Sequence, residues 1–256
     1  QPSMTGMRTM YQEGELLVVQ GVSYPNPNLS HFRATDIWLT AANSNEYLND
    51  GWAGRYLIGE YPGFPTGYPN SMMPDPPAIQ IGAVTSPALE GPGRSLGISI
   101  QDPNTFYQLV AGAPTGGQDT APTTPAGREL EFVRLVAAQS IQYATQVKAA
   151  ADKVKLQSAY PASNSLADQL KIVARLIAGG MKTRMYIVSM GGFDNHSSQV
   201  DATDPTIGTH ATLLKRLSDA IAAFQGDLKY LGVEQRVIGM TFSEFGRRVQ
   251  SNASRG

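Results

Sequence analysis

The feature that most constrains the fold of this chain is the alternation of short apolar runs with amphipathic helical patterns. Residues 130–154, 166–177 and 213–231 place apolar side chains three and four positions apart, the spacing of one helix face. Short apolar runs with the length of buried strands occur at 16–19, 78–81, 96–100, 185–190 and 237–240. Strands that alternate with helices predict an α/β fold, with a mostly parallel sheet and helices on both faces.

Shorter helices are expected at 3–13, 31–42, 52–58 and 103–110. Asp102 is the expected N-cap of the last of these, because its carboxylate can accept a hydrogen bond from an unpaired backbone N–H. Ser165 and Asp168 have the spacing of a capping box at the start of the helix that follows them. A further helix is expected from Ser243 onward.

Two stretches interrupt the regular pattern. Residues 62–77 contain six prolines and cannot form a helix or a central strand, so we expect an ordered surface loop there. Residues 113–127 are low in complexity and are the best candidate for a mobile lid or linker. We expect residues 1–256 to form a single domain that carries these two loops.

Composition excludes several classes of site and partner. The net charge is −1, so we expect no nucleic-acid partner and no basic patch for membrane surfaces. The absence of cysteine excludes disulfides, thiolate metal sites and cysteine nucleophiles. No apolar run approaches the roughly 18 residues of a membrane span, so none is expected.

Side chains capable of chemistry gather where three of the expected strands end. Ser30 and His31 follow the first run, Asp194 and His196 follow the run at 185–190, and Glu244 follows the run at 237–240. In open α/β sheets, ligands bind outside the carboxyl ends of the strands. These junctions are therefore where we expect a functional site.

The Asp194–His196 pair has two interpretations. An Asp-x-His sequence can supply an oxygen and a nitrogen to one divalent ion, with zinc, calcium and manganese as candidates. The alternative is a loop aspartate that closes an Asx turn beside an exposed histidine. Its position after a buried strand favours the functional interpretation.

Ser30 and His31 also have structural alternatives. Ser30 is either the N-cap of the helix or a nucleophilic or phosphate-binding hydroxyl at the positive end of that helix, and the two roles can coexist. His31 can orient a substrate, bind a metal or pack against a neighbouring aromatic ring. No G-x-S-x-G motif accompanies Ser30, which argues against a Ser-His-Asp hydrolase of that type.

The third junction offers an acid and two cations. Glu244 can be a metal ligand, a general base or a first-turn acid favoured by the helix dipole. Arg247 can bind an anionic group in a bidentate manner, and Arg248 is better explained as part of a solvated helix face. We expect Asn28 and Arg247 to contact the substrate, while His210 is expected to be a surface residue.

The sequences GVSYPNPNLSHFRATDIW, GGFDNHSSQ and TFSEFGRRVQSNASRG together resemble the family called domain of unknown function 1501. Members of that family are bacterial, are commonly exported through the twin-arginine pathway, and resemble the alkaline phosphatase and sulfatase superfamily. The resemblance implies an alkaline-phosphatase-like core and a periplasmic or extracellular location. By the same analogy, Ser30 stands where that superfamily has its nucleophile, and Asp194 and His196 stand where it has metal ligands.

Two segments of the family pattern do not occur in this sequence. One is an earlier segment that supplies the first strand, and the other is a later segment that begins with Asp-His-Gly. We therefore expect the chain to be an internal fragment of the domain, which lacks the first strand and the C-terminal segment.

Two functions follow as hypotheses. The first is a metal-dependent hydrolase of phosphate or sulfate esters, with a small anionic ester as substrate and Ser30, His31 and Glu244 as catalytic residues. It predicts that Ser30, Asp194, His196 and Glu244 converge. The second is a non-catalytic binding or structural protein on the same fold, with a protein partner or a second copy of the chain as its ligand.

Overall fold

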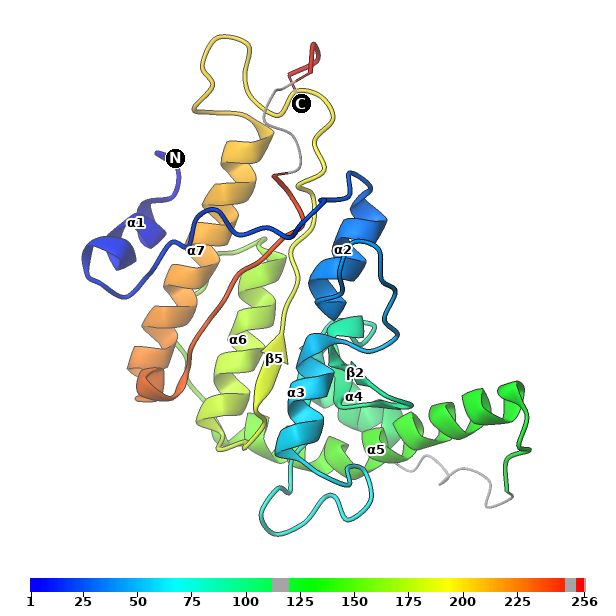
Figure 1. Ribbon diagram of the computed structural model, residues 1–256. Helices are drawn as coiled ribbons and strands as arrows, with labels where there is room; N and C mark the ends of the chain where they lie inside the picture. The colour runs from blue at the N-terminus through cyan, green and yellow to red at the C-terminus, as the bar shows by residue number, and fades with distance from the viewer. Residues whose placement is uncertain (112–119, 247–251, 256) are drawn as a thin grey trace. The chain divides into compact units, whose positions relative to one another are not determined.

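The computed structural model describes most of the chain, namely residues 1–111, 120–246 and 252–255 (Figure 1). The chain divides into two compact units. The first contains Gln1–Thr35, Leu156–Ala174 and Val188–Gly256, and the second contains Asp36–Lys155 and Arg175–Ile187. Each unit is therefore built from pieces that are distant in the sequence.

The second unit contains a three-stranded parallel sheet in the order β4-β1-β5. Strand β1 (Ala78–Ile81) lies in the centre, between β4 (Gly97–Ile100) and β5 (Met185–Ile187). Ala78 is in register with Gly97 on one side and Met185 on the other. Helices surround this sheet, and it does not close into a barrel in the part of the chain that the structure describes, so the predicted α/β class with a parallel sheet is confirmed.

The core of the second unit lies around β1, which contains three apolar residues and the buried polar residue Gln80. Every residue of β1 is buried, as expected for a central parallel strand that is covered on both faces. Leu57, Phe64, Leu89 and Leu96 pack with Ala78 in one buried cluster. Leu57 comes from α3 (Trp52–Glu60), and Leu89 from the 3₁₀ turn η1 (Pro87–Leu89). The loop at 62–77 is irregular, as predicted, apart from its turns.

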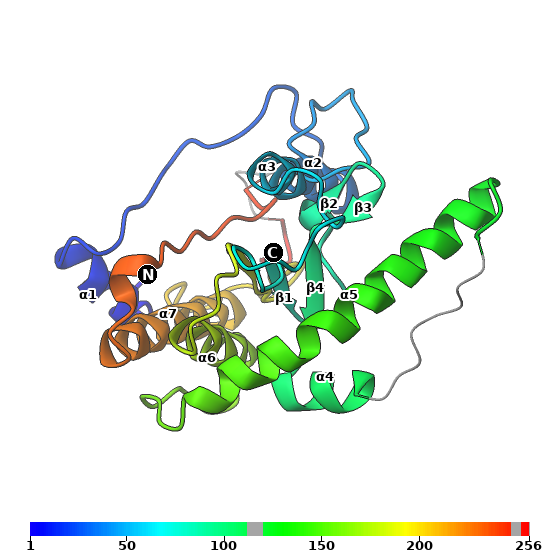
Figure 2. The same cartoon turned by 90° about the horizontal axis from the view of Figure 1, so that it is seen from below.

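The remaining elements of the second unit are a short ribbon and two helices. Strands β2 (Glu90–Gly91) and β3 (Arg94–Ser95) pair in antiparallel fashion. Helices α4 (Pro103–Val110) and α5 (Pro125–Lys153) lie side by side (Figure 2).

The capping and burial of these helices test two further predictions. Asp102 is the N-cap of α4, as predicted, because its Oδ1 accepts from the backbone N–H groups of Asn104 and Thr105. The apolar stripe predicted on α5 is buried in its later part, at Tyr143 and Val147, whereas Leu130 and Val133 near its start are exposed. Residues 113–119 of the predicted lid at 113–127 lie outside the described residues.

The first unit is mainly helical. Helix α1 (Thr5–Gln12) lies beside α7 (Thr209–Tyr230), and the Met7 N–H donates to Ser218 Oγ at 3.0 Å (Figure 1). Leu166 and Leu170 of α6 (Ser165–Ala178) pack against Ala220 of α7. The unit also contains the start of α2 (His31–Thr40) and the 3₁₀ turn η2 (Glu234–Arg236). None of the described helices combines the length and apolar character that a membrane crossing requires.

The cap of α6 differs from the prediction. Asn164, rather than Ser165, precedes the helix: its Oδ1 accepts from the Ala167 N–H at 3.3 Å and its carbonyl accepts from the Asp168 N–H at 3.0 Å. Asparagine is among the best N-cap residues, so it takes this position in preference to the serine that follows it. The capping box predicted from Ser165 and Asp168 is therefore wrong.

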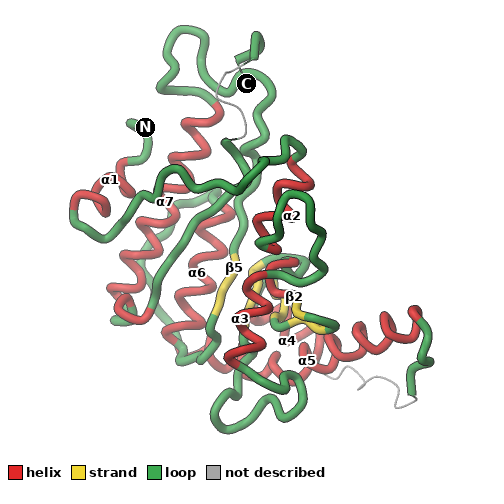
Figure 3. The backbone as a smooth tube through the Cα atoms, viewed as in Figure 1, coloured by secondary structure: helices red, strands yellow, loops and turns green. Residues whose placement is uncertain are grey.

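Two of the predicted strands are loops. Residues 16–19 and 237–240 join no strand among the described residues, and both run as irregular segments (Figure 3). Their side chains are exposed, with Leu17 at 84% and Ile238 at 98%. A strand needs a neighbour to satisfy its backbone hydrogen bonds, and apolar sequence alone does not supply one.

The strand predicted at 185–190 ends at Ile187 because its next hydrogen bonds go to a side chain. The Ser189 N–H donates to Gln169 Oε1 at 3.0 Å, and the Ser189 carbonyl accepts from Gln169 Nε2 at 2.9 Å. The amide of Gln169 thus takes the place of a neighbouring strand. The helix predicted from Ser243 is also wrong within the described residues, where Ser243 Oγ accepts from the Phe245 N–H at 3.0 Å and forms a turn.

Candidate metal centre

The loop after β5 is shaped by a glycine pair. Val188 and Met190 pack against the α6–α7 core, and the chain then turns at Gly191-Gly192, where Gly192 has a φ of +92°. Asn195 closes the turn, since its N–H donates to the Phe193 carbonyl and its Nδ2 donates to the Gly192 carbonyl. This turn fixes the backbone on both sides of Asp194.

The start of α2 is organised by two capping interactions. Asn28 Oδ1 accepts from the Ser30 N–H at 2.8 Å, and the Ser30 carbonyl accepts from the Ala34 N–H at 2.9 Å. Asn28 in turn donates its own N–H to the Tyr24 hydroxyl. His31 is therefore the first residue of the helix, held at a fixed point by the turn that precedes it.

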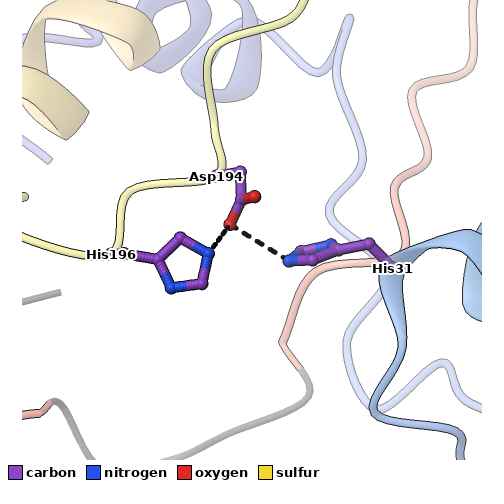
Figure 4. Close-up of side chains that lie close together, drawn as sticks. All are labelled: His31, Asp194 and His196. Carbon is purple, nitrogen blue, oxygen red and sulfur yellow. Dashed lines mark ion pairs between the residues drawn. The ribbon is translucent and has the colours of Figure 1, made fainter.

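Three side chains converge from these two segments (Figure 4). Asp194 Oδ1 lies 3.1 Å from His31 Nε2 and 2.9 Å from His196 Nε2. The three atoms all lie within 4.8 Å of one another. His31 thus meets a pair that is far away in the sequence but belongs to the same compact unit.

The spacing of these atoms suits one divalent ion. Zinc binds nitrogen and oxygen ligands at about 2.0–2.2 Å, so two ligands of a tetrahedral ion lie roughly 3.3 Å apart. The observed separations of 2.9 and 3.1 Å are close to that value. Two imidazoles with one carboxylate favour zinc, iron or manganese over calcium, which prefers an all-oxygen shell.

Three protein ligands leave at least one coordination position for water or substrate, which distinguishes catalytic zinc sites from closed structural ones. The exposure of the ligands is consistent with such access. The side chains of Asp194 and His196 are 54% and 80% exposed, whereas that of His31 is 24% exposed. One ligand is thus sheltered and two face solvent.

Glu244 contacts His31 at Nδ1, the ring nitrogen that does not face Asp194. Its Oε1 lies 3.1 Å from His31 Nδ1, and its side chain is 19% exposed. It is not among the grouped ligand atoms, which come from His31, Asp194 and His196 alone. Glu244 therefore contacts the predicted site through His31.

Aromatic rings line the same region, and they were not predicted as part of the site. The Phe245 ring lies 4.9 Å from the His31 ring and 6.4 Å from the Phe193 ring, measured between centroids. His210, which was predicted to be a surface residue, is partly buried: its ring centroid lies 6.2 Å from that of Phe193, and its Nδ1 lies 3.2 Å from Gln199 Nε2. The adjacency of Phe193 to Asp194, and of Phe245 to Glu244, was the signal available.

A family model described as Protein of unknown function (DUF1501) matches residues 114–256, which is more than half of the chain. The chain belongs to this family. No curated protein and no solved structure matches it. The matched region of this DUF1501 chain includes Asp194, His196 and Glu244, while His31 lies before it.

The remaining predicted site residues of this DUF1501 chain are Ser30, Asn28 and Arg247. Ser30 is exposed and precedes His31 at the start of α2. The Asn28 carboxamide oxygen is engaged in the turn before that helix. Arg247 and Arg248 lie outside the described residues.

Proposed function

We propose that this DUF1501 protein is a metal-dependent hydrolase of phosphate or sulfate esters. The observation that supports the proposal is the convergence of His31, Asp194 and His196 around one point, with open access from solvent. A bound divalent ion would polarise the ester and stabilise the charge that develops on its oxygens. The mixed nitrogen and oxygen ligands make zinc the first candidate.

The protein's own residues have separate roles in this proposal. His31, Asp194 and His196 bind the metal. The Ser30 hydroxyl, exposed and adjacent to His31, attacks phosphorus or sulfur as its proton leaves. The ester bond to the leaving group then breaks, and the departing alkoxide takes up a proton, which balances the proton lost by Ser30. Water then attacks the phosphorylated or sulfated Ser30, which releases phosphate or sulfate and returns the proton to the serine oxygen. Asn28 and Arg247 would contact the anionic part of the substrate.

The same proposal includes a distant kinship with alkaline phosphatases and sulfatases and a periplasmic or extracellular location. A parallel sheet and a cluster of metal-type ligands at a helix start and a loop are consistent with that kinship. Fold-level kinship does not by itself establish chemistry. The metal centre therefore carries the proposal.

The decisive experiment measures metal in the purified protein by elemental mass spectrometry, together with the intact mass. We expect about one equivalent of metal per chain, following the one cluster described above. Asp194→Ala/His196→Ala should retain none. Asp204→Ala is the matched control, because this exposed aspartate contacts Thr206 and lies outside the cluster.

Turnover of p-nitrophenyl phosphate and p-nitrophenyl sulfate tests the reaction itself. Ser30→Ala should keep the metal and lose activity by at least about a hundredfold, because the nucleophile is removed. Full activity in Ser30→Ala would contradict the nucleophile assignment. A wild-type chain that takes up none of zinc, manganese and calcium would contradict the metallohydrolase and favour a binding role for the fold.

A further inference from the structure

We propose that Glu244 is a positioning residue that fixes the tautomer and the orientation of His31, so that His31 Nε2 faces the metal. This inference rests on the proposed metal centre. It assigns Glu244 a role that differs from those of ligand and general base. Glu244 contacts His31 at Nδ1, whereas Nε2 of the same ring faces Asp194 Oδ1.

The tautomer follows from the two nitrogen contacts of one ring. His31 Nδ1 lies 3.1 Å from Glu244 Oε1. An ionised carboxylate can only accept hydrogen bonds, so Nδ1 must carry the hydrogen in this contact. His31 Nε2 also faces a carboxylate oxygen, Asp194 Oδ1 at 3.1 Å, so without a metal both ring nitrogens can donate. When an ion lies between Nε2 and Asp194 Oδ1, Nε2 must give it the lone pair, and the one ring hydrogen of the neutral imidazole is then on Nδ1.

The other tautomer would be unsuited to metal binding. It would place an N–H on Nε2, directed into the cluster of ligand atoms, and leave Nδ1 facing a carboxylate with no hydrogen between them. A histidine ligand usually donates its second N–H to a carboxylate or carbonyl, which fixes the ring and raises the basicity of the metal-binding nitrogen. Glu244 is the residue placed to accept that hydrogen bond.

The ring of His31 is also held by the residue after Glu244. The Phe245 ring packs against it with centroids 4.9 Å apart and the planes inclined by 57°. Consecutive side chains diverge by about 100° in a helix and about 180° in a strand, so neither element would direct both at one ring. The turn at Ser243 supplies the required backbone.

Burial divides the site in the same way. His31 and Glu244 have side chains that are 24% and 19% exposed, against 80% for His196. A hydrogen bond to a charged acceptor is stronger where it is sheltered from water. The His31–Glu244 pair is therefore the sheltered half of the centre, and the remaining ligands form its open half.

Isothermal titration of the metal-free protein with zinc tests the inference. Glu244→Ala should weaken zinc binding by about 10- to 100-fold, the usual effect of removing such a partner. Glu244→Gln should fall between wild type and Glu244→Ala, because an amide oxygen can still accept from Nδ1–H but carries no charge. Glu13→Ala, which removes an exposed acid of the same unit, is the control and should bind zinc as wild type does.

A double-mutant cycle separates positioning from a general structural effect. If Glu244 acts through His31, then Glu244→Ala should weaken zinc binding by less than about twofold when His31→Ala is already present. Long-range ¹H–¹⁵N spectra of the zinc-loaded wild type should show the His31 hydrogen on Nδ1. Circular dichroism of each metal-free variant shows whether it is folded.

The outcomes distinguish this inference from the proposed function. Zinc binding by the wild type with equal affinity in Glu244→Ala, or a His31 hydrogen on Nε2, would overturn the positioning role and leave the metal centre intact. An equal loss in the presence and absence of His31 would also overturn it. A wild-type protein that takes up none of zinc, manganese and calcium would overturn both.

Discussion

The strongest stability prediction concerns Asp227, a fully buried carboxylate on α7. It accepts three hydrogen bonds from the segment that joins α5 and α6. Oδ1 accepts from the Ser158 N–H at 2.7 Å, and Oδ2 accepts from Gln157 Nε2 at 2.8 Å and from the Tyr160 hydroxyl at 2.9 Å. The substitution Asp227→Ala would remove the shared acceptor of all three donors.

The size of the effect follows from these partners. A hydrogen bond to a charged group contributes about 1.5–3 kcal/mol, and a buried donor left without a partner is destabilising by about 1–3 kcal/mol. Gln157 Nε2 keeps a second acceptor in the Lys171 carbonyl, so the effect comes mainly from the Ser158 N–H and the Tyr160 hydroxyl, which lose the acceptor described above. We therefore expect Asp227→Ala to lower the free energy of unfolding by about 3–5 kcal/mol, a large part of the 5–15 kcal/mol typical of a domain.

Urea denaturation followed by circular dichroism measures this change. Asp227→Asn should lose less, about 1–3 kcal/mol, because it keeps the shape and one acceptor oxygen. Asp219→Ala is the control on the same helix: it breaks a surface pair with Lys215 and should cost less than about 1 kcal/mol. A loss below about 1 kcal/mol in Asp227→Ala would refute the reasoning.

The same variant should not change the metal centre while it stays folded. His210 lies near the centre, because its ring contacts that of Phe193, the residue before Asp194. Asp227 follows His210 by 17 positions along α7, which corresponds to about 25 Å of helix. Zinc affinity of folded Asp227→Ala should therefore equal that of wild type. A large fall in affinity without unfolding would show that the network also shapes the site.

Two further predictions concern backbone strain and alkaline pH. Gly192→Ala should destabilise the protein by about 1–3 kcal/mol in thermal unfolding, because Gly192 has a φ of +92° and an added Cβ would lie 3.3 Å from Leu213 Cδ2. Gly191→Ala is the control, because a Cβ added at Gly191 would have no atom within 4 Å. Burial raises the pKa of Tyr143 to about 12, so the neutral phenol is favoured in the folded state. Its contribution to stability is full below the unfolded-state value of about 10 and is lost as pH rises through about 12, a loss that Tyr143→Phe should not show.

Local patterns in the sequence were sufficient for the long helices. The three- and four-residue spacings predicted α5, α6 and α7, because a helix makes its backbone hydrogen bonds within itself. The strands at 16–19 and 237–240 were mispredicted, because a strand forms only beside a second strand, and that second strand can come from anywhere in the chain. The Gln169 side chain that ends β5 could not be foreseen for the same reason.

The candidate site was predictable in part. Asp194 and His196 stand out as a pair after an apolar run, and His31 follows a proline-containing turn, so each was identifiable from its own segment. The partnership of His31 with Glu244 joins residues 213 positions apart and could not be read from either. The pattern around Glu244 suggested a ligand, a general base or a first-turn acid, and its contact with His31 Nδ1 is the basis of the positioning role that we propose.

The discontinuous construction of the first unit determines when the proposed metal centre can form during synthesis. His31 is made before its partners Asp194 and His196, which belong to the last of the unit's three pieces, beginning at Val188. Until that piece has been synthesised, a nascent chain holds one of the three grouped residues and cannot form the centre. Metal binding at the proposed site would therefore follow synthesis of the third piece, and a bound ion would add to stability in proportion to its differential affinity for the folded state.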